Sequence, residues 1–158
     1  MSASLIFDIA PIGSLVAWSD GTVQPPERHR KKLSAWKSRN SQGRLIRKQA
    51  GRTTGTYIAQ PDFTIHEGDF GSAGTIVLRV FRTFSIDSDL TFKVVDRPVI
   101  GSVRIFDRPG AGAELVHLAV SRADAETWLT QHRHPLAVLE EVTADEAAAT
   151  VVEGRAAA

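Results

Sequence analysis

Ten basic residues lie between Arg28 and Arg52, and no acidic residue occurs from Arg28 to Pro61. Lysine and arginine side chains neutralise phosphate groups, so such a run is typical of a surface that binds nucleic acid with little base specificity. The aromatic rings of Trp36 and Tyr57 could stack on exposed bases if the target is single-stranded. The predicted nucleic-acid contacts are Arg28, Arg30, Lys31, Lys32, Trp36, Lys37, Arg39, Arg44, Arg47, Lys48 and Arg52.

The C-terminal part of the sequence has the opposite charge. Residues 113–158 contain eight acids and three arginines, so the net charge of +1 is the sum of two regions of opposite sign. We therefore expect a small non-enzymatic protein that binds nucleic acid, of a type that the sequence leaves open. The alternative is a protein–protein adaptor or inhibitor that docks through its opposed basic and acidic surfaces. In that case the basic segment pairs with an acidic partner, with the acidic C-terminal helices of the same chain, or with a second copy in a homo-oligomer.

A third hypothesis, an enzyme, rests on His66, Glu67 and Asp69, which place three potential metal ligands within four residues. Histidine and carboxylates together can hold a divalent cation or transfer protons. The second histidine of a helical zinc-protease motif is missing, because position 70 is Phe70. Cysteine is absent, which excludes disulfides, thiolate metal sites and cysteine nucleophiles. We predict no catalytic residue, no metal and no cofactor.

Motifs for nucleotide hydrolysis and serine catalysis are missing as well. Glycines cluster over residues 68–74, but no Gly-Lys-Ser/Thr ending follows them as in a phosphate-binding loop. No serine occurs in a Gly-x-Ser-x-Gly pattern.

Two features of the β-rich region are more informative about structure. His117 fits a packed strand residue, and Arg82 interrupts an apolar strand face, which indicates a strand crossing to solvent, a bulge, or a buried ion pair with an acid such as Asp96.

The elements that must position these residues follow from apolar spacing and turn residues. Strands are expected over 5–9 and 14–18, and a basic helix over 26–40, which Pro25-Pro26 begins and Gly43 follows. Leu33 and Trp36 give this helix only a narrow apolar edge, so most of its basic side chains should stay exposed. The middle of the chain predicts strands over 44–48, 56–60, 62–66, 75–86, 91–96, 100–106 and 114–120, with residues 107–112 as a hairpin loop.

The C-terminal part is expected to alternate helix and strand. Ser121 fits a helix N-cap, Pro135 ends that helix, a strand covers 136–142, and Thr143 opens a second helix. The predicted fold class is α+β: a mostly antiparallel twisted sheet or partial barrel, with one basic N-terminal helix and two C-terminal helices packed on it.

The length of 158 residues fits a single α+β domain over 1–153, with a disordered tail over 154–158. Two sub-units, 1–98 and 99–153, are possible within it. No stretch is apolar enough for a membrane span and the N-terminus lacks a signal pattern, so we expect a cytoplasmic protein without membrane partners. Arginine outnumbers lysine 14 to 5, which favours a GC-rich bacterial origin.

Overall fold

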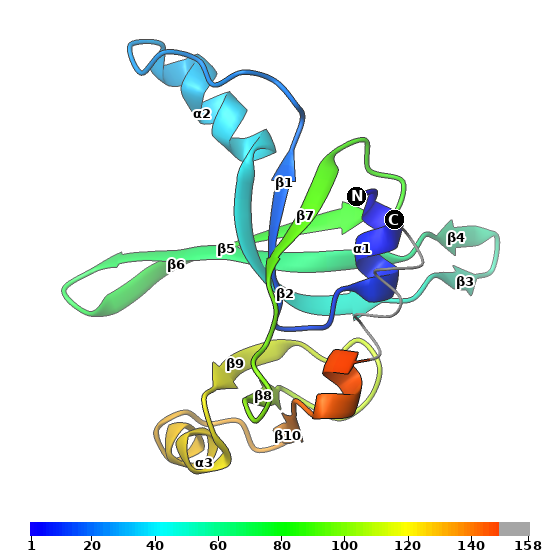
Figure 1. Ribbon diagram of the computed structural model, residues 1–158, viewed down its shortest axis with the longest axis vertical. Helices are drawn as coiled ribbons and strands as arrows, with labels where there is room; N and C mark the ends of the chain where they lie inside the picture. The colour runs from blue at the N-terminus through cyan, green and yellow to red at the C-terminus, as the bar shows by residue number, and fades with distance from the viewer. Residues whose placement is uncertain (149–158) are drawn as a thin grey trace.

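The computed structural model describes residues 1–148 and has an α+β fold built from antiparallel sheets (Figure 1). The elements in chain order are α1 (Ala3–Ile9), β1 (Leu15–Ser19), α2 (Arg30–Arg39), β2 (Ser41–Gln49), β3 (Arg52–Thr54), β4 (Tyr57–Ala59), β5 (Asp62–Ser72), β6 (Thr75–Ser85), β7 (Thr91–Asp96), β8 (Val103–Phe106), β9 (Leu115–Ala119), α3 (Arg122–Gln131) and β10 (Val138–Glu141). Residues 144–148 are also helical, and the rest of the helix expected from Thr143 lies outside the described residues. So does the tail expected over 154–158.

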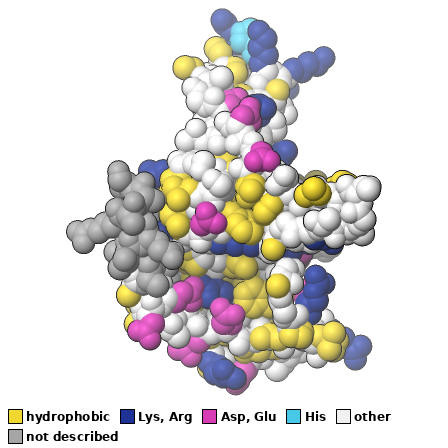
Figure 2. Space-filling model, turned by 90° about the vertical axis from the view of Figure 1, so that its right-hand side faces the viewer, with side chains coloured by type: hydrophobic (Ala, Val, Ile, Leu, Met, Phe, Trp, Pro, Cys, Tyr) yellow, Lys and Arg dark blue, Asp and Glu magenta, His cyan; other side chains and the backbone are white. Residues whose placement is uncertain are grey.

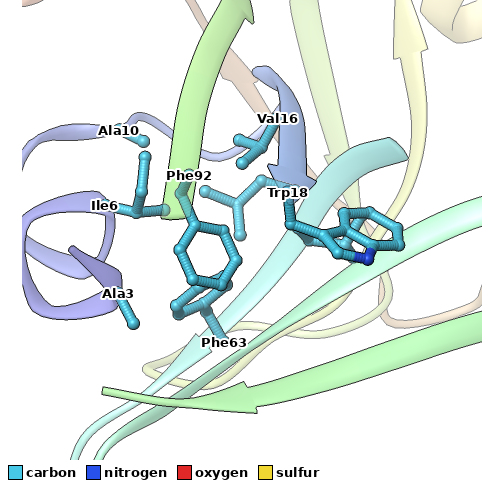
Figure 3. Close-up of a cluster of buried hydrophobic side chains, with 9 residues drawn as sticks. Ala3, Ile6, Ala10, Val16, Trp18, Phe63 and Phe92 are labelled. Carbon is cyan, nitrogen blue, oxygen red and sulfur yellow. The ribbon is translucent and has the colours of Figure 1, made fainter. Parts of the chain in front are cut away.

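The largest sheet has five strands in the order β6-β5-β2-β1-β7, with every neighbouring pair antiparallel. One face of this sheet is covered by α1, and the main hydrophobic core lies between them (Figure 3). Aromatic rings meet in this core, with the centroids of Phe63 and Phe92 5.4 Å apart and those of Phe84 and Phe92 5.2 Å apart. The buried residues of this cluster are Ala3, Ile6, Ala10, Val16, Trp18, Leu45, Phe63, Ile65 and Phe92.

The N-terminal segment corrects the prediction of a strand over 5–9, because it forms helix α1 instead. The Ser2 side chain caps this helix by accepting a hydrogen bond from the Leu5 backbone N–H at 3.3 Å. The buried residues Ala3, Ile6 and Ile9 recur every three positions, which places them along one helix face. The isoleucines and Phe7 favour a strand by propensity, and packing against the sheet overrides that preference.

A second sheet has three strands in the order β10-β8-β9, and α3 packs on it. Residues 107–112 connect the antiparallel strands β8 and β9, as expected for a hairpin loop. The two sheets meet through a shared apolar cluster in which Ile46 of β2 packs with Phe106 of β8 and Leu115 of β9. Ser121 caps α3 by accepting a hydrogen bond from the Asp124 backbone N–H at 3.2 Å.

Three parts project from this body: α2, the hairpin β3–β4, and the outer half of the hairpin β5–β6 (Figure 1). None of the α2 residues is buried, and this helix extends beyond the ends of the inner strands β1 and β2 instead of packing on a sheet face as expected (Figure 1). Its apolar edge of Leu33 and Trp36 is too narrow to bury a helix face. The strand expected over 56–60 is shorter, and it pairs with an additional strand at Arg52–Thr54. Among the described residues, no helix combines the length and the apolar character needed to cross a membrane.

Candidate nucleic-acid interface

The basic residues on and before α2 point into solvent. Arg28, Arg30, Lys31, Lys32 and Lys37 are all exposed, and within residues 1–148 none of them forms an ion pair. Lys and Arg side chains therefore gather at the upper end of the molecule, over α2 (Figure 2). We call these five residues the basic arm. Four of its five residues lie on α2, which contributes no buried side chain to the core, and Arg28 lies just before that helix.

The base of the arm is held by a network around Asp20. The Asp20 carboxylate accepts hydrogen bonds from the Thr22 hydroxyl at 2.6 Å, from the Asn40 amide at 2.9 Å and from Arg39 Nε at 3.1 Å. These bonds, with Thr22 contributing most, hold the pKa of Asp20 well below its usual range. Arg39 also lies 3.5 Å from Asp89. Arg39 is thus engaged by two acids and helps to position the arm.

Trp36 is also engaged within the protein. Its indole N–H donates to the Thr22 carbonyl at 3.0 Å, and the side chain is half-buried. This contact ties the middle of α2 to the loop before it. Trp36 therefore has a structural role in addition to any contact with a base.

The basic residues of β2 point into the protein body. Arg44 Nη1 donates to the Gly13 carbonyl at 2.6 Å, and Lys48 Nζ donates to the Phe7 carbonyl at 2.5 Å. Arg47 Nη2 donates to the Thr64 hydroxyl at 3.3 Å. All three side chains are partly buried. The structure thus separates them from the basic arm, although they follow it closely in the sequence.

Arg47 lines a cavity of about 340 Å³ together with Arg52 and Arg108. The three guanidinium groups that line this cavity can donate hydrogen bonds to an anion. The Nε atom of Arg47 is itself buried and has no hydrogen-bond partner within the described residues. Tyr57, which is 67% exposed, and Arg52 line a smaller cavity nearby. Sequence reasoning missed Arg108, because residues 107–112 were assigned only to a hairpin loop.

Two acids of the C-terminal segment pair with the buried Arg104 and not with the basic arm. Arg104 is 2% exposed, and its guanidinium binds Glu140 at 3.1 Å and both carboxylate oxygens of Glu146. Its Nε also donates to the Ile12 carbonyl at 2.7 Å. These two acids compensate a buried arginine that lies outside the basic segment.

The three potential ligands His66, Glu67 and Asp69 do not converge. His66 Nε2 lies 2.7 Å from Asp69 Oδ1, whereas Glu67 lies 3.0 Å from Arg82 Nε. Arg82 lies opposite Ile65 in the register of β5 and β6, and Glu67 shares the strand face of Ile65 because side chains alternate along a strand. Of the alternatives left open for Arg82, the structure has an ion pair, with Glu67 instead of the suggested Asp96. Within the described part of the chain, no three His, Asp or Glu residues lie close enough to hold a metal ion.

Residues 1–146 match the model of a protein family described as Uncharacterised conserved protein UCP036055. The chain belongs to this family. The matched range contains every element from α1 to β10, the basic arm included. No curated protein and no solved structure matches the chain.

Proposed function

We propose that this protein binds nucleic acid, and that the basic arm makes the phosphate contacts. The observation that carries the proposal is the exposure of five cations that have no acidic partner in the described structure. They lie on or just before α2, in which no residue is buried. Cations that are neither paired nor needed for packing remain free to displace counterions from a phosphate backbone. We include a bacterial, cytoplasmic setting in this proposal.

The exposed side chains form a smaller set of nucleic-acid contacts than the one expected from the sequence. Arg28, Arg30, Lys31, Lys32 and Lys37 are the primary contacts, and the cavity of Arg47, Arg52 and Arg108 offers a second place for a phosphate group. Arg39 and Trp36 support the arm. Arg44 and Lys48 hold backbone carbonyls of the loop and helix before β1. Their replacement should therefore affect folding as well as binding.

Fluorescence anisotropy at low salt tests the proposal, with labelled duplex DNA, single-stranded DNA and RNA of equal length. We expect saturable binding to at least one of them. The variant R30Q/K31Q/K32Q should bind more weakly across all sequences of that type, because phosphate contacts carry no base information. Absence of binding to all three nucleic acids at low salt would show that the proposal is wrong.

An adaptor function is the second candidate, and the outer part of the β5–β6 hairpin favours it. Phe70 is 58% exposed, Val77 78% and Leu78 57%. Neighbouring exposed apolar side chains on a projecting hairpin are typical of protein–protein contacts. A protein partner that is retained after nuclease treatment, and lost when Val77 and Leu78 are replaced by serine, would support this function.

A further inference from the structure

A cavity of about 360 Å³ opens between the two sheets, between the β5–β6 hairpin on one side and β9 with α3 on the other. Both sides extend in the same direction from the body, with the hairpin above α3 (Figure 1). Small-ligand sites commonly have ~300–1,000 Å³ and lie between structural units. We call this cavity the inter-sheet cleft. Its main functional groups belong to Arg44, His66, Arg79, Phe81, His117 and Trp128.

The hairpin wall of the inter-sheet cleft holds an organised polar group. Asp69 Oδ1 lies 2.7 Å from His66 Nε2 and 3.5 Å from Arg79 Nε. The Phe81 ring lies 5.4 Å from the His66 ring. The Nη groups of Arg79 make no hydrogen bond within residues 1–148, and the side chain is 56% exposed. Arg79 can therefore present two N–H donors to an anion while Asp69 keeps it in place.

The opposite wall is a flat stack of rings. The Trp128 indole is parallel to the His117 imidazole, at 4.8 Å and 2°, and to the His132 imidazole, at 4.1 Å and 8°. Burial, with the nearby His132 and Arg44, lowers the pKa of His117, although Asp124 opposes the shift. This lowered pKa favours the neutral imidazole, which offers one N–H donor and one acceptor.

Arg44 from β2 brings a second guanidinium to the cleft. Its Nη1 is held by the Gly13 carbonyl at 2.6 Å, which fixes the side chain. Glu114, on the β9 side, is the other acid of the lining besides Asp69. A carboxylate in this place can accept hydrogen bonds from the N–H groups of a ligand. The cleft thus joins two guanidinium groups, aromatic surfaces and one carboxylate acceptor.

We propose that the inter-sheet cleft binds a mononucleotide unit. Arg44 and Arg79 hold its phosphate, because planar guanidinium groups pair with phosphate oxygens through two parallel hydrogen bonds. The base lies against Phe81 and against the ring stack to which Trp128 belongs, since aromatic rings offer stacking to every base. The unit is either a free nucleotide or the phosphorylated end of a strand. This site is separate from the basic arm and does not depend on the function proposed for that arm.

Isothermal titration calorimetry with the four ribonucleoside 5′-monophosphates, each at up to about 1 mM, tests this proposal. At least one should bind, and it should bind at least about tenfold more tightly than its nucleoside or inorganic phosphate, because each of those lacks half of the contacts. R79Q and F81A should each weaken binding by about fivefold or more, because they remove a phosphate contact and a stacking ring. R122Q, on the exposed surface of α3, is the matched control and should leave binding unchanged. Failure of all four nucleotides to bind, or unchanged binding in R79Q and F81A, would overturn the proposal.

The source of the nucleotide is distinguished by a second titration with a 5′-phosphorylated dinucleotide. If the dinucleotide binds and R79Q weakens this binding, the cleft is assigned to strand ends. If only mononucleotides bind, the cleft is assigned to free nucleotides. The variant R30Q/K31Q/K32Q separates the two proposals. It should retain full mononucleotide binding even where it loses nucleic-acid binding, and loss of mononucleotide binding in this variant would contradict a separate site.

Discussion

At the scale of single residues, Arg104 shows how the acidic C-terminal segment is used. Its side chain is 3% exposed and binds the Ile12 carbonyl, Glu140 and Glu146. A buried charge is tolerated only with this degree of pairing. The arginine thereby connects β8 to β10, to the helical residues that begin at Ala144, and to the loop after α1.

Replacement of Arg104 by alanine should destabilise the protein by about 1.5–3 kcal/mol, because the Ile12 carbonyl and two partly exposed carboxylates lose a buried donor. Urea denaturation followed by circular dichroism measures this loss. R122A is the control, since Arg122 and Glu126 form an exposed i,i+4 pair worth about 0.5 kcal/mol or less. A loss below about 1 kcal/mol for R104A would show that the network around Arg104 is not a structural requirement.

His117 predicts a pH dependence of stability. Its pKa is lowered in the folded protein from the ordinary 6.5, so the unfolded chain binds a proton more readily. The stabilisation from the neutral ring is complete above pH 6.5 and is lost as the pH falls through the lowered folded pKa. The Tm of the protein should therefore fall between pH 7.5 and pH 5.5 by more than the Tm of H117N does. Equal decreases of Tm in the two proteins would contradict this role.

Charge patterns could be predicted from the sequence, but the partners of the charges could not. The ten basic residues between Arg28 and Arg52 were evident from the sequence. Which of them are exposed was not, because Arg44, unlike Lys31 and Lys32, is bound by the Gly13 carbonyl of a distant loop. For Arg82, the sequence left a strand crossing to solvent, a bulge and an ion pair open. Glu67 is its partner because of the strand register between β5 and β6, which no local pattern in the sequence specifies.

At the scale of elements, the strands with clear alternation or clear boundaries were predicted best. The range 91–96 coincides with β7, and the antiparallel hairpin of β8 and β9 was expected from the turn residues between them. α1 was missed because seven residues are too short for helical periodicity to be distinguished from a strand. The cleft residues could not be found, since His66, His117 and Trp128 come from three distant segments.

The pairing of β2 with β5 depends on the absence of a side chain at Gly43. A Cβ atom there would lie 2.4 Å from the His66 carbonyl oxygen and 2.9 Å from Glu67 Cα. G43A should therefore destabilise the protein by about 1–3 kcal/mol through overpacking against backbone atoms. G68A is the control, because the nearest atom to its Cβ is a Phe70 ring carbon at 3.8 Å, and we expect a change within about 0.5 kcal/mol. Equal effects of the two variants in thermal denaturation would argue against this close approach.

At the scale of the whole molecule, the net charge of +1 is the sum of basic and acidic groups that lie in different parts of the fold. Glu140 and Glu146 compensate a buried arginine, and the cations of the basic arm project from the opposite end of the fold without such compensation (Figures 1 and 2). We therefore expect this chain to attract phosphate polymers more strongly than its net charge alone would suggest.

The salt dependence of nucleic-acid binding tests this account most directly. We predict that log K falls linearly with log salt concentration, and that R30Q/K31Q/K32Q lowers the magnitude of this slope by about one for each removed cation that contacts a phosphate. The matched variant K93Q/R122Q/R133Q removes the same charge from exposed positions outside the basic arm and should leave the slope unchanged. Both variants should keep the Tm of the natural sequence, because none of the six side chains is buried. An equal slope and affinity in the natural protein and in R30Q/K31Q/K32Q would contradict the central claim that the basic arm is the phosphate-binding surface.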